Sequence, residues 1–350
     1  MHQFDYSFLE NKLVPANLIN VTSAIASLKM MDQLRKNDFK TIFTELEKVA
    51  KVQSVKSSNA IEGIITTDDR IAAIVNGQSA PLNHNEAEIA GYRDALNTIH
   101  LNYSSIDITE QDVLKLHNIL FSYYGMNDAG IYKKENNVIL EYDANGLKKV
   151  RFTPVAAADT PTAMQQLVLA YAEARNNARI HPLILIPCVI LDFLCIHPFR
   201  DGNGRMSRLL SLLLLYKNEY DVGKYISFEE QINNHKTLYY DALKRSSQNW
   251  AVNKNDYMPF VQNFLTILYK CYLELDKRFA IVNSGKINKQ SRVEATILNS
   301  LVPISKAEIC TILPDVSPTT VEAVLGKMVR EDKIVKIGTS INIKYIRKQL

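Results

Sequence analysis

The residue types that can do chemistry gather in one short segment, His197-Pro198-Phe199-Arg200-Asp201-Gly202-Asn203-Gly204-Arg205-Met206-Ser207-Arg208. The segment offers an imidazole base, a carboxylate that can bind a metal ion, two glycines and two arginines. An apolar run precedes it and a second apolar helical pattern follows it, so the glycines lie at the start of a helix. Backbone N–H groups and the positive dipole end bind anions there. We therefore expect a phosphate ligand.

The spacing of these side chains points to a reaction of phosphates. Arg205 and Arg208 are three residues apart on one helix face, and both can reach phosphate oxygens. Asp201 offers the hard oxygen that Mg²⁺ prefers, since Mg²⁺ takes its other ligands from water and phosphates. His197 has an ordinary pKa of about 6.5, so at neutral pH it can accept a proton from a hydroxyl. Phe199 is expected to anchor the loop in the core. These residues predict nucleotidyl or phosphoryl transfer.

The segment resembles the signature of the Fic (filamentation induced by cAMP) family, His-Pro-Phe-x-(Asp/Glu)-Gly-Asn-Gly-Arg-x-x-Arg, at every fixed position. The resemblance implies transfer of AMP from ATP to a hydroxyl side chain of a target protein. It implies that His197 deprotonates the hydroxyl and Asp201 holds Mg²⁺. It also implies phosphate binding, with Gly202, Asn203 and Gly204 around the α- and β-phosphates and Arg205 and Arg208 on the β- and γ-phosphates.

A second motif lies far upstream, in Ser57-Ser58-Asn59-Ala60-Ile61-Glu62-Gly63. Through Ser58, Glu62 and Gly63 it resembles the inhibitory motif of Fic proteins. The resemblance implies that the Glu62 carboxylate pairs with Arg208 and competes with the γ-phosphate for the same guanidinium. The alternative is that Ser58 caps a helix end and Glu62 lies on a solvated face. In some relatives this glutamate positions a water that removes AMP, so the reverse reaction stays open.

A β-hairpin is predicted between the two motifs. Val138-Ile139-Leu140 and Val150-Arg151-Phe152-Thr153 flank Asp143-Ala144-Asn145-Gly146, and Asn-Gly between β-prone runs is a strong hairpin signal. An isolated hairpin leaves an edge that can pair with an extended peptide. The resemblance implies that residues 138–153 are the flap on which the target docks. The lead-in Gly130-Ile131-Tyr132-Lys133 has lysine where many relatives have arginine. A hairpin without a ligand is the alternative.

A tyrosine-rich helical pattern follows downstream, in Asn234-His235-Lys236-Thr237-Leu238-Tyr239-Tyr240. It resembles the helix that walls the nucleotide pocket in Fic proteins. The resemblance makes Tyr240 the candidate for the adenosine side, although a core position is the alternative. An asparagine that often follows in relatives is replaced by Ser246-Ser247-Gln248, which leaves the identity of the base open.

Composition indicates a folded protein of more than one domain. The chain has 350 residues, 47% of them hydrophobic, and a net charge of +4. It shows neither a signal peptide nor a membrane span, because its most apolar stretch, from Leu183 to Ile196, is short and contains Pro187 and Asp192. The four cysteines are scattered through apolar segments without metal-ligand spacing, which predicts reduced core residues and a cytoplasmic location.

Most of the remaining chain has helical periodicity. Apolar residues recur at three- and four-residue spacing over Val21–Val52 and Asn85–Ile99, and Thr109 begins a further helix that reaches Leu120. We therefore predict a mostly α-helical fold, a Fic-type helical bundle with one hairpin. The expected divisions are a helical region with the inhibitory motif (1–105), a Fic core (106–283) and a winged-helix domain (284–350).

The winged-helix prediction depends on the order of elements in the last sixty or so residues. A polar linker up to Ser291 precedes two short helical patterns, Ser317-Pro318 opens a third, and Val335–Ile337 and Ile341–Ile346 flank a turn. From Gly285 onward there are eleven Lys and Arg against six Asp and Glu, a net of +5. This excess favours DNA, but the helix after Ser317 begins without the side chains that read bases best. A packing or protein-docking domain is the alternative.

Several functions stay compatible with the sequence. The same scaffold can transfer another nucleotide, remove AMP, or transfer phosphate. A nucleotide-sensing, DNA-binding regulator is the alternative outside enzymes. The partners expected are ATP, with Mg²⁺ as cofactor, and a protein target. A homo-oligomer also stays open, and the sequence identifies neither the target nor what relieves inhibition.

Overall fold

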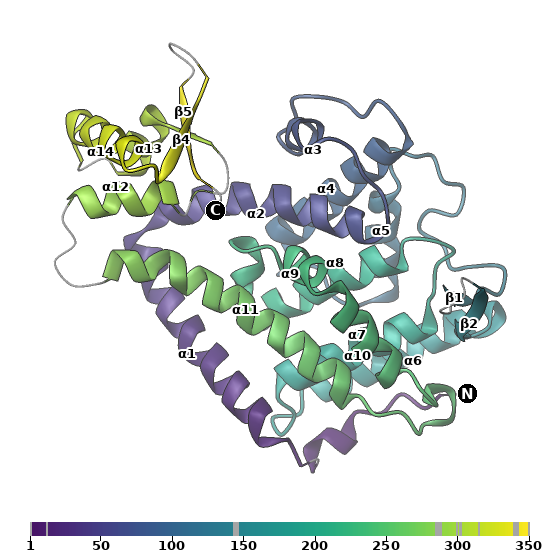
Figure 1. Cartoon of the computed structure of the whole chain (residues 1–350). Helices are drawn as coiled ribbons and strands as arrows, with labels where there is room; N and C mark the ends of the chain where they lie inside the picture. The colour runs from purple at the N-terminus through teal and green to yellow at the C-terminus, as the bar shows by residue number, and fades with distance from the viewer. Residues whose placement is uncertain are drawn as a thin grey trace. The chain divides into compact units, whose positions relative to one another are not determined.

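The computed structural model folds the chain mainly into α-helices, with two small antiparallel sheets among the residues that it describes (Figure 1). Those residues are 2–11, 13–142, 147–283, 289–298, 300, 303–313, 316–338 and 343–348. Two compact units are present, a larger unit of residues 1–27 and 50–271 and a smaller unit of residues 28–49 and 272–350. The predicted mostly α-helical class is confirmed. Within the described ranges, no helix has both the length and the apolar character needed to cross a membrane.

The limits of the two units fall inside three long helices, α1 (Ala16–Asp38), α2 (Lys40–Ile61) and α11 (Met258–Asn283). The single helical pattern expected from Val21 to Val52 was wrong at Phe39, where α1 has ended and α2 has not begun. The two residues before the break are Asn and Asp, which favour turns over helix interiors. The division into 1–105, 106–283 and 284–350 stays a prediction.

The other elements of the larger unit follow in chain order. They are η1 (Ser7–Glu10), α3 (Asp68–Val75), α4 (His84–Asn102), α5 (Glu110–Leu120), β1 (Ile139–Tyr142), β2 (Lys148–Phe152), η2 (Ala157–Asp159), α6 (Thr160–Arg175), α7 (Pro182–Ile196), α8 (Asn203–Lys217), η3 (Asp221–Lys224), α9 (Phe228–Asn234), α10 (Lys236–Ser246) and η4 (Trp250–Val252). The predicted cap of α5 is present, because Thr109 Oγ1 accepts a hydrogen bond from Asp112 N at 3.1 Å.

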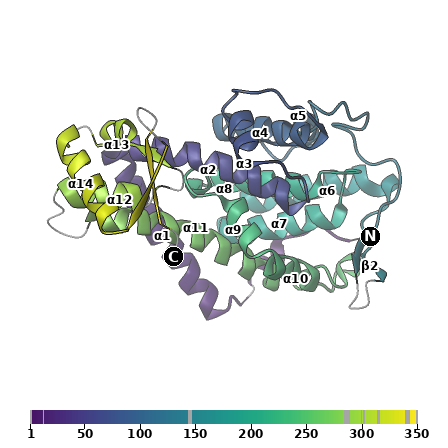
Figure 2. The same cartoon turned by 45° about the horizontal axis from the view of Figure 1, so that its top comes forward.

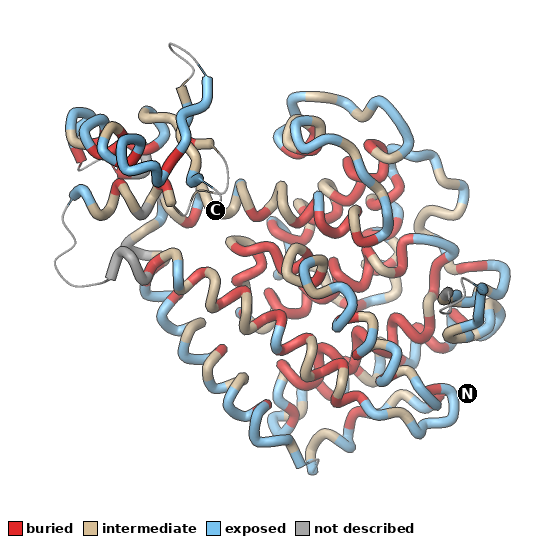
Figure 3. The backbone as a smooth tube through the Cα atoms, viewed as in Figure 1, coloured by how far each residue is buried: buried red, intermediate tan, exposed pale blue. Residues whose placement is uncertain are grey.

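Helices α7 and α8 form the centre of the larger unit. All residues of α7 from Leu183 to Ile196 are buried, as are nearly all of α8. A helix that is apolar on every side must be surrounded by other elements. α7 packs against α6 and α8, and α8 also packs against α4, so that these helices lie side by side in Figures 1 and 2. Figure 3 shows the buried residues following this pair. The loop between α7 and α8 is therefore fixed at both ends.

A buried carboxyl group links α7 to the beginning of the chain. Asp192, which is fully buried, accepts hydrogen bonds from Tyr6 Oη at 2.8 Å, Trp250 Nε1 at 2.7 Å and Tyr257 Oη at 2.9 Å. Burial raises the pKa of Asp192 to about 7, although these three donors act in the opposite direction. The network joins the N-terminal segment, α7 and the region before α11.

The predicted hairpin is confirmed in its two strands. β1 pairs antiparallel with β2, Leu140 lies opposite Val150, and the register shifts between Ile139 and Leu140. The turn expected at Asp143–Gly146 lies outside the described residues. Two contacts join the hairpin to α10: Arg151 Nη2 donates to Tyr240 O at 3.1 Å, and Lys244 Nζ donates to Glu141 Oε2 at 2.8 Å. The hairpin is thus held against α10.

The smaller unit contains a second sheet. Its elements after α11 are α12 (Lys289–Leu298), β3 (Ile304–Ser305), α13 (Lys306–Ile312), α14 (Pro318–Arg330), β4 (Ile334–Ile337) and β5 (Lys344–Arg347). The strands are ordered β3-β5-β4, and apolar side chains of α12, α13 and α14 form a core. Ser317 caps α14 as expected, through Thr320 N. The linker was predicted three residues too long, because α12 begins at Lys289. The winged-helix assignment stays a prediction.

Many basic side chains of the smaller unit are paired with acids of the same unit. Lys333 Nζ is 2.7 Å from Glu331, Lys327 Nζ is 3.7 Å from Glu294, and Lys348 pairs with Asp332. Lys306 pairs with Glu322 in the same way. These pairs use acids that the count already subtracts, so the net charge of +5 from Gly285 onward is unchanged by them.

Candidate active site

The signature segment forms the loop between α7 and α8, as predicted. His197 ends α7 in the left-handed conformation, with φ 52°, and Gly202 has φ 79° immediately before α8. A non-glycine residue in this region costs about 1 kcal/mol, so the surroundings must hold His197 in place. The Asn203 side chain closes the loop, because its Oδ1 accepts from Phe199 N at 2.9 Å and its Nδ2 donates to Phe199 O at 2.8 Å.

Phe199 anchors the loop, as the sequence predicted. Its ring is fully buried and stacks on His117, with the centroids 3.7 Å apart. His117 Nδ1 accepts from Gly130 N at 2.9 Å, so its Nε2 donates to Asp201 O at 3.1 Å. Burial lowers the pKa of His117 to about 4, which keeps the ring neutral. His117 is a structural histidine that supports the loop from α5.

Lys133 forms hydrogen bonds with the residues on both sides of His197. Its Nζ donates to Ile196 O at 3.2 Å and to Asn137 Oδ1 at 2.9 Å, while its backbone N–H donates to Pro198 O at 2.9 Å. Burial lowers the pKa of Lys133 to about 8. The sequence drew attention to this lysine only as a departure from its relatives. Its contact with the carbonyl groups beside the base could not be read from spacing.

His197 is a neutral base in this environment. Its Nδ1 donates to Leu194 O at 3.3 Å, which leaves Nε2 as an acceptor. Burial lowers the pKa of His197 to about 4, and the charge of Lys133 acts in the same direction. The ring is therefore ready to accept a proton at neutral pH.

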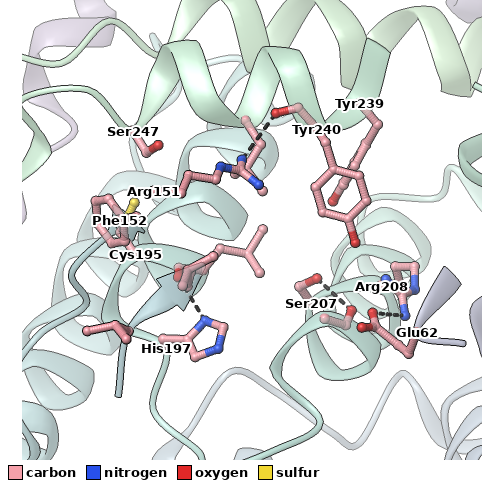
Figure 4. A pocket seen from close by; sticks show the side chains of 15 residues that line it. Glu62, Arg151, Phe152, Cys195, His197, Ser207, Arg208, Tyr239, Tyr240 and Ser247 are labelled. Carbon is pink, nitrogen blue, oxygen red and sulfur yellow. Dashed lines mark hydrogen bonds and ion pairs between the residues drawn. The ribbon is translucent and has the colours of Figure 1, made fainter. Parts of the chain in front are cut away.

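A cavity of about 310 Å³ opens beside His197. Its lining residues come from the end of α2, both hairpin strands, α7, α8 and α10 (Figure 4). They are Glu62, Val138, Ile139, Arg151, Phe152, Leu194, Cys195, His197, Gly204, Ser207, Arg208, Tyr239, Tyr240, Leu243 and Ser247. A volume of this size, with apolar walls and a few polar groups, suits a small ligand. Tyr240 lies in the wall, as predicted.

Arg208 is engaged by the upstream motif. Its Nε donates to Ser58 Oγ at 2.8 Å, and its Nη2 donates to Ser58 O at 2.9 Å and to Glu62 Oε1 at 2.8 Å. Arg208 is only 2% exposed, and Ser58 is fully buried. The ion pair that the resemblance implied between Glu62 and Arg208 is present, and Ser58, instead of capping a helix end, binds Arg208.

Gly63 explains how α2 ends at Ile61, immediately before Glu62. Gly63 has φ 82°, its N–H donates to Ala60 O at 3.1 Å, and Ile64 N–H donates to Asn59 O at 3.0 Å. These are the two hydrogen bonds of a Schellman motif, in which glycine takes the left-handed position. Lys236, the first residue of α10, donates from Nζ to Ile61 O at 2.7 Å. The helix thus stops one residue before Glu62, whose carboxylate faces Arg208 of α8.

The Glu62 carboxylate occupies the predicted anion position. A Cβ added to Gly204 would lie 2.3 Å from Glu62 Oε1, so only glycine leaves room for this approach. Burial acts to raise the pKa of Glu62, but the charge of Arg208 and its hydrogen bond outweigh burial, and the pKa is lowered. The carboxylate is therefore ionised at the start of α8.

Two predicted phosphate contacts point elsewhere. Arg205 does not line the cavity; its Nη2 lies 2.6 Å from Glu88 Oε2, and its guanidinium lies over the Phe121 ring. The Asn203 side chain is used within the loop, which leaves its backbone N–H for an anion. Arg205 and Arg208 are three residues apart on α8, but their side chains contact different neighbouring helices. Their phosphate contacts stay predictions.

Asp201 offers one carboxylate at the mouth of the loop. Its side chain is 65% exposed, Oδ1 accepts from Gly202 N at 2.6 Å, and Oδ2 lies 3.9 Å from Arg205 Nη2. Among the described residues, no group of three His, Cys, Asp or Glu side chains could hold a metal ion. This donor set fits Mg²⁺ only where phosphate oxygens and water complete the coordination.

Comparison with known proteins gives the same family as the signature. Residues 107–215 match the profile of the Fic/DOC family. A protein adenylyltransferase Fic from Nematostella vectensis is 26% identical over 281 residues, which are 75% of this chain and 60% of that protein. One from Drosophila yakuba is 29% identical over 223 residues, 62% of this chain and 40% of that protein. The chain thus spans 60% or less of the length of these curated relatives.

Solved structures share the fold. A Fic family protein from Desulfovibrio desulfuricans G20 has a TM-score of 0.62 at 20% identity, covering 96% of this chain and 97% of that one. A Fic domain containing signaling protein from Bacteroides thetaiotaomicron has a TM-score of 0.59 at 20% identity, covering 75% of this chain and 97% of that one.

Proposed function

Because the chain carries a Fic/DOC family domain in residues 107–215, we propose that it is a protein adenylyltransferase, which transfers AMP from ATP to a hydroxyl side chain of a target protein. The observation that carries the proposal is a neutral His197 in the same cavity wall as the start of α8 and Arg208. A base for the hydroxyl and an anion site for the phosphates are both needed for this reaction.

The chemistry follows from these positions. The target oxygen attacks the α-phosphorus of ATP while His197 Nε2 accepts the hydroxyl proton. The bond between the α-phosphorus and the bridging oxygen breaks, and pyrophosphate leaves. Backbone N–H groups at the start of α8 stabilise the charge on the phosphates. When bound, Mg²⁺ would offset charge on the phosphates beside Asp201.

The proposal includes inhibition by the chain itself. Glu62 accepts a hydrogen bond from the Arg208 guanidinium, which the γ-phosphate would otherwise bind. The ionised Glu62 carboxylate also lies beside Gly204, where it repels phosphate. A nucleotide that binds in the productive position must therefore displace Glu62. The same carboxylate lies in the cavity wall with His197 and could orient a water, which makes AMP removal the second candidate.

The hairpin is proposed to receive the target. The side chains of Val138, Leu140 and Val150 are about half exposed, and β1 has only β2 as a described neighbour. An extended target segment can pair with such an edge and bring its hydroxyl to His197. Because α14 begins without the side chains that read bases best, we favour packing or protein docking over DNA binding for the smaller unit.

The test is incorporation of label from α-phosphate-labelled ATP, with Mg²⁺, into the chain itself or into lysate proteins. The variants are wild type, Glu62→Gly, and Glu62→Gly combined with His197→Ala. We expect strong labelling in Glu62→Gly, little in wild type and none in the double variant. Labelling from γ-phosphate-labelled ATP instead would show phosphate transfer, and no label in any variant with ATP binding intact would refute the proposed reaction.

A further inference from the structure

A second guanidinium lines the cavity, and the signature does not account for it. Arg151 projects from β2 into the wall formed by the hairpin and α10. Its Nη2 donates to Tyr240 O at 3.1 Å, and its guanidinium lies 5.7 Å from the centroid of the Tyr240 ring. Its remaining N–H groups have no hydrogen-bond partner among the described residues.

The charge of Arg151 is only partly offset within the part of the chain that the structure describes. No described carboxylate forms an ion pair with it, and Glu141, the carboxylate whose charge acts on Arg151, is bound by Lys244. Burial lowers the pKa of Arg151, which reflects a cation withdrawn from water without a full counter-charge. Arg208, by contrast, is paired with Glu62. A ligand with hydrogen-bond acceptors would therefore gain by binding at Arg151.

The position of Arg151 indicates which part of a nucleotide it meets. Figure 4 shows Arg151 beside Phe152, Cys195 and Ser247, whereas Glu62 and Arg208 lie together at the other end. Apolar side chains are present at the Arg151 end: Phe152 lines the cavity there, and so does Ile139, which lies opposite Phe152 in the hairpin. Phosphates belong at the start of α8, so the base lies at the apolar end.

We propose that Arg151 is a specificity-determining residue that donates hydrogen bonds to the acceptor edge of the nucleobase. The inference rests on the proposed function, because it requires a nucleotide whose phosphates lie at Arg208. A guanidinium has donors only, and it pairs in bidentate fashion with O6 and N7 of guanine. Adenine presents N7 beside an amino group, so it accepts one such bond. Among purine nucleoside triphosphates, those of guanine should therefore depend most on Arg151.

The test measures binding rather than transfer. Glu62→Gly combined with His197→Ala frees the phosphate site and prevents turnover, and calorimetry then gives the affinities for ATP, GTP and inorganic triphosphate. Adding Arg151→Ala is expected to weaken GTP on the order of tenfold, to weaken ATP less, and to leave triphosphate unchanged. Arg151→Lys keeps the charge but loses the planar pair of donors. It should therefore weaken GTP more than ATP, as Arg151→Ala does.

Lys149→Ala is the matched control. Lys149 lies two residues earlier on the same strand and is exposed, and it does not line the cavity. It should leave all three affinities unchanged, and the melting temperatures of all variants should agree within a few degrees. Equal weakening of all three ligands by Arg151→Ala would overturn base recognition in favour of phosphate binding or a general distortion. No weakening of any ligand would also overturn it.

Failure of the base contact can be distinguished from failure of the proposed AMP transfer. If the labelling experiment fails while GTP and ATP bind with the expected dependence on Arg151, AMP transfer is refuted and the base contact is supported. If no nucleoside triphosphate binds when Arg151 is present, the base contact is refuted together with the nucleotide site.

Discussion

The buried carboxyl group of Asp192 should make the stability of the larger unit fall as pH rises. Asp192 accepts three hydrogen bonds from Tyr6, Trp250 and Tyr257, and burial raises its pKa to about 7. In the unfolded chain this pKa returns to 3.8. The perturbation is Asp192→Asn, which keeps the shape of the side chain and removes its titration.

The sign and size follow from proton binding. Between pH 3.8 and about 7 the folded chain holds a proton on Asp192 that the unfolded chain has lost, so the free energy of unfolding decreases as pH rises. Each pH unit in that window corresponds to about 1.4 kcal/mol, which gives about 4 kcal/mol over the whole window. Below pH 3.8 the full stabilisation is present, and above about 7 the dependence ends.

The assay is urea unfolding followed by tryptophan fluorescence. The chain has one tryptophan, Trp250, whose Nε1 donates to Asp192, so the signal reports on this network. We expect the free energy of unfolding of wild type minus that of Asp192→Asn to fall by about 3 kcal/mol from pH 5 to pH 8. The difference removes the contribution of other groups, such as His117 and His197, whose lowered pKa values act in the opposite direction.

A matched control is Asp241→Asn, which removes an exposed carboxylate of α10. Its difference from wild type should not change between pH 5 and pH 8. If the Asp192→Asn difference is also independent of pH, Asp192 is ionised throughout, and the argument from its burial is refuted.

Three further outcomes are expected. Glu62→Gln should raise the apparent ATP affinity by roughly 10- to 100-fold in calorimetry, since a hydrogen bond between charged groups contributes about 1.5–3 kcal/mol. The control is Glu86→Gln, which disrupts the ion pair of Glu86 with Arg70 outside the cavity lining and should leave the ATP affinity unchanged. Equal effects of the two substitutions would contradict competition. Gly63→Ala should lower the free energy of unfolding by about 1 kcal/mol because φ is 82°, whereas Gly326→Ala in a helix should not lower it. Labelling by Glu62→Gly should be independent of pH from 6 to 9 and fall only as pH approaches the His197 pKa of about 4. A fall near pH 6.5 would show that the pKa of His197 is not lowered, which would contradict the argument from burial.

The sequence predicted those parts of the site that a single motif or a resemblance determines. The glycine turn, the Phe199 anchor, the hairpin strands and the pairing of Glu62 with Arg208 could be anticipated, because a motif or a resemblance fixes them. Helix boundaries were less accurate, as the break at Phe39 shows, since apolar periodicity continues through it.

Long-range partners could not be predicted. Glu88 meets Arg205 because α4 packs against α8, and no sequence pattern connects the two residues. Arg151 and Phe152 point to opposite sides of a strand, yet both line the cavity, because the cavity surrounds the end of β2. Alternation along the strand therefore gave no sign that Arg151 belongs to the site.

The burial of Arg208 has a consequence for how much active protein a cell can maintain. With Glu62 removed, an unpaired cation remains buried next to the positive end of α8, and breaking such a pair is strongly destabilising. The phosphates of a nucleotide can take the place of the carboxylate and restore that stability as any ligand of the folded state does. We expect the uninhibited chain to be cleared faster by proteases whenever nucleotide is scarce, so that its abundance follows the supply of its own substrate.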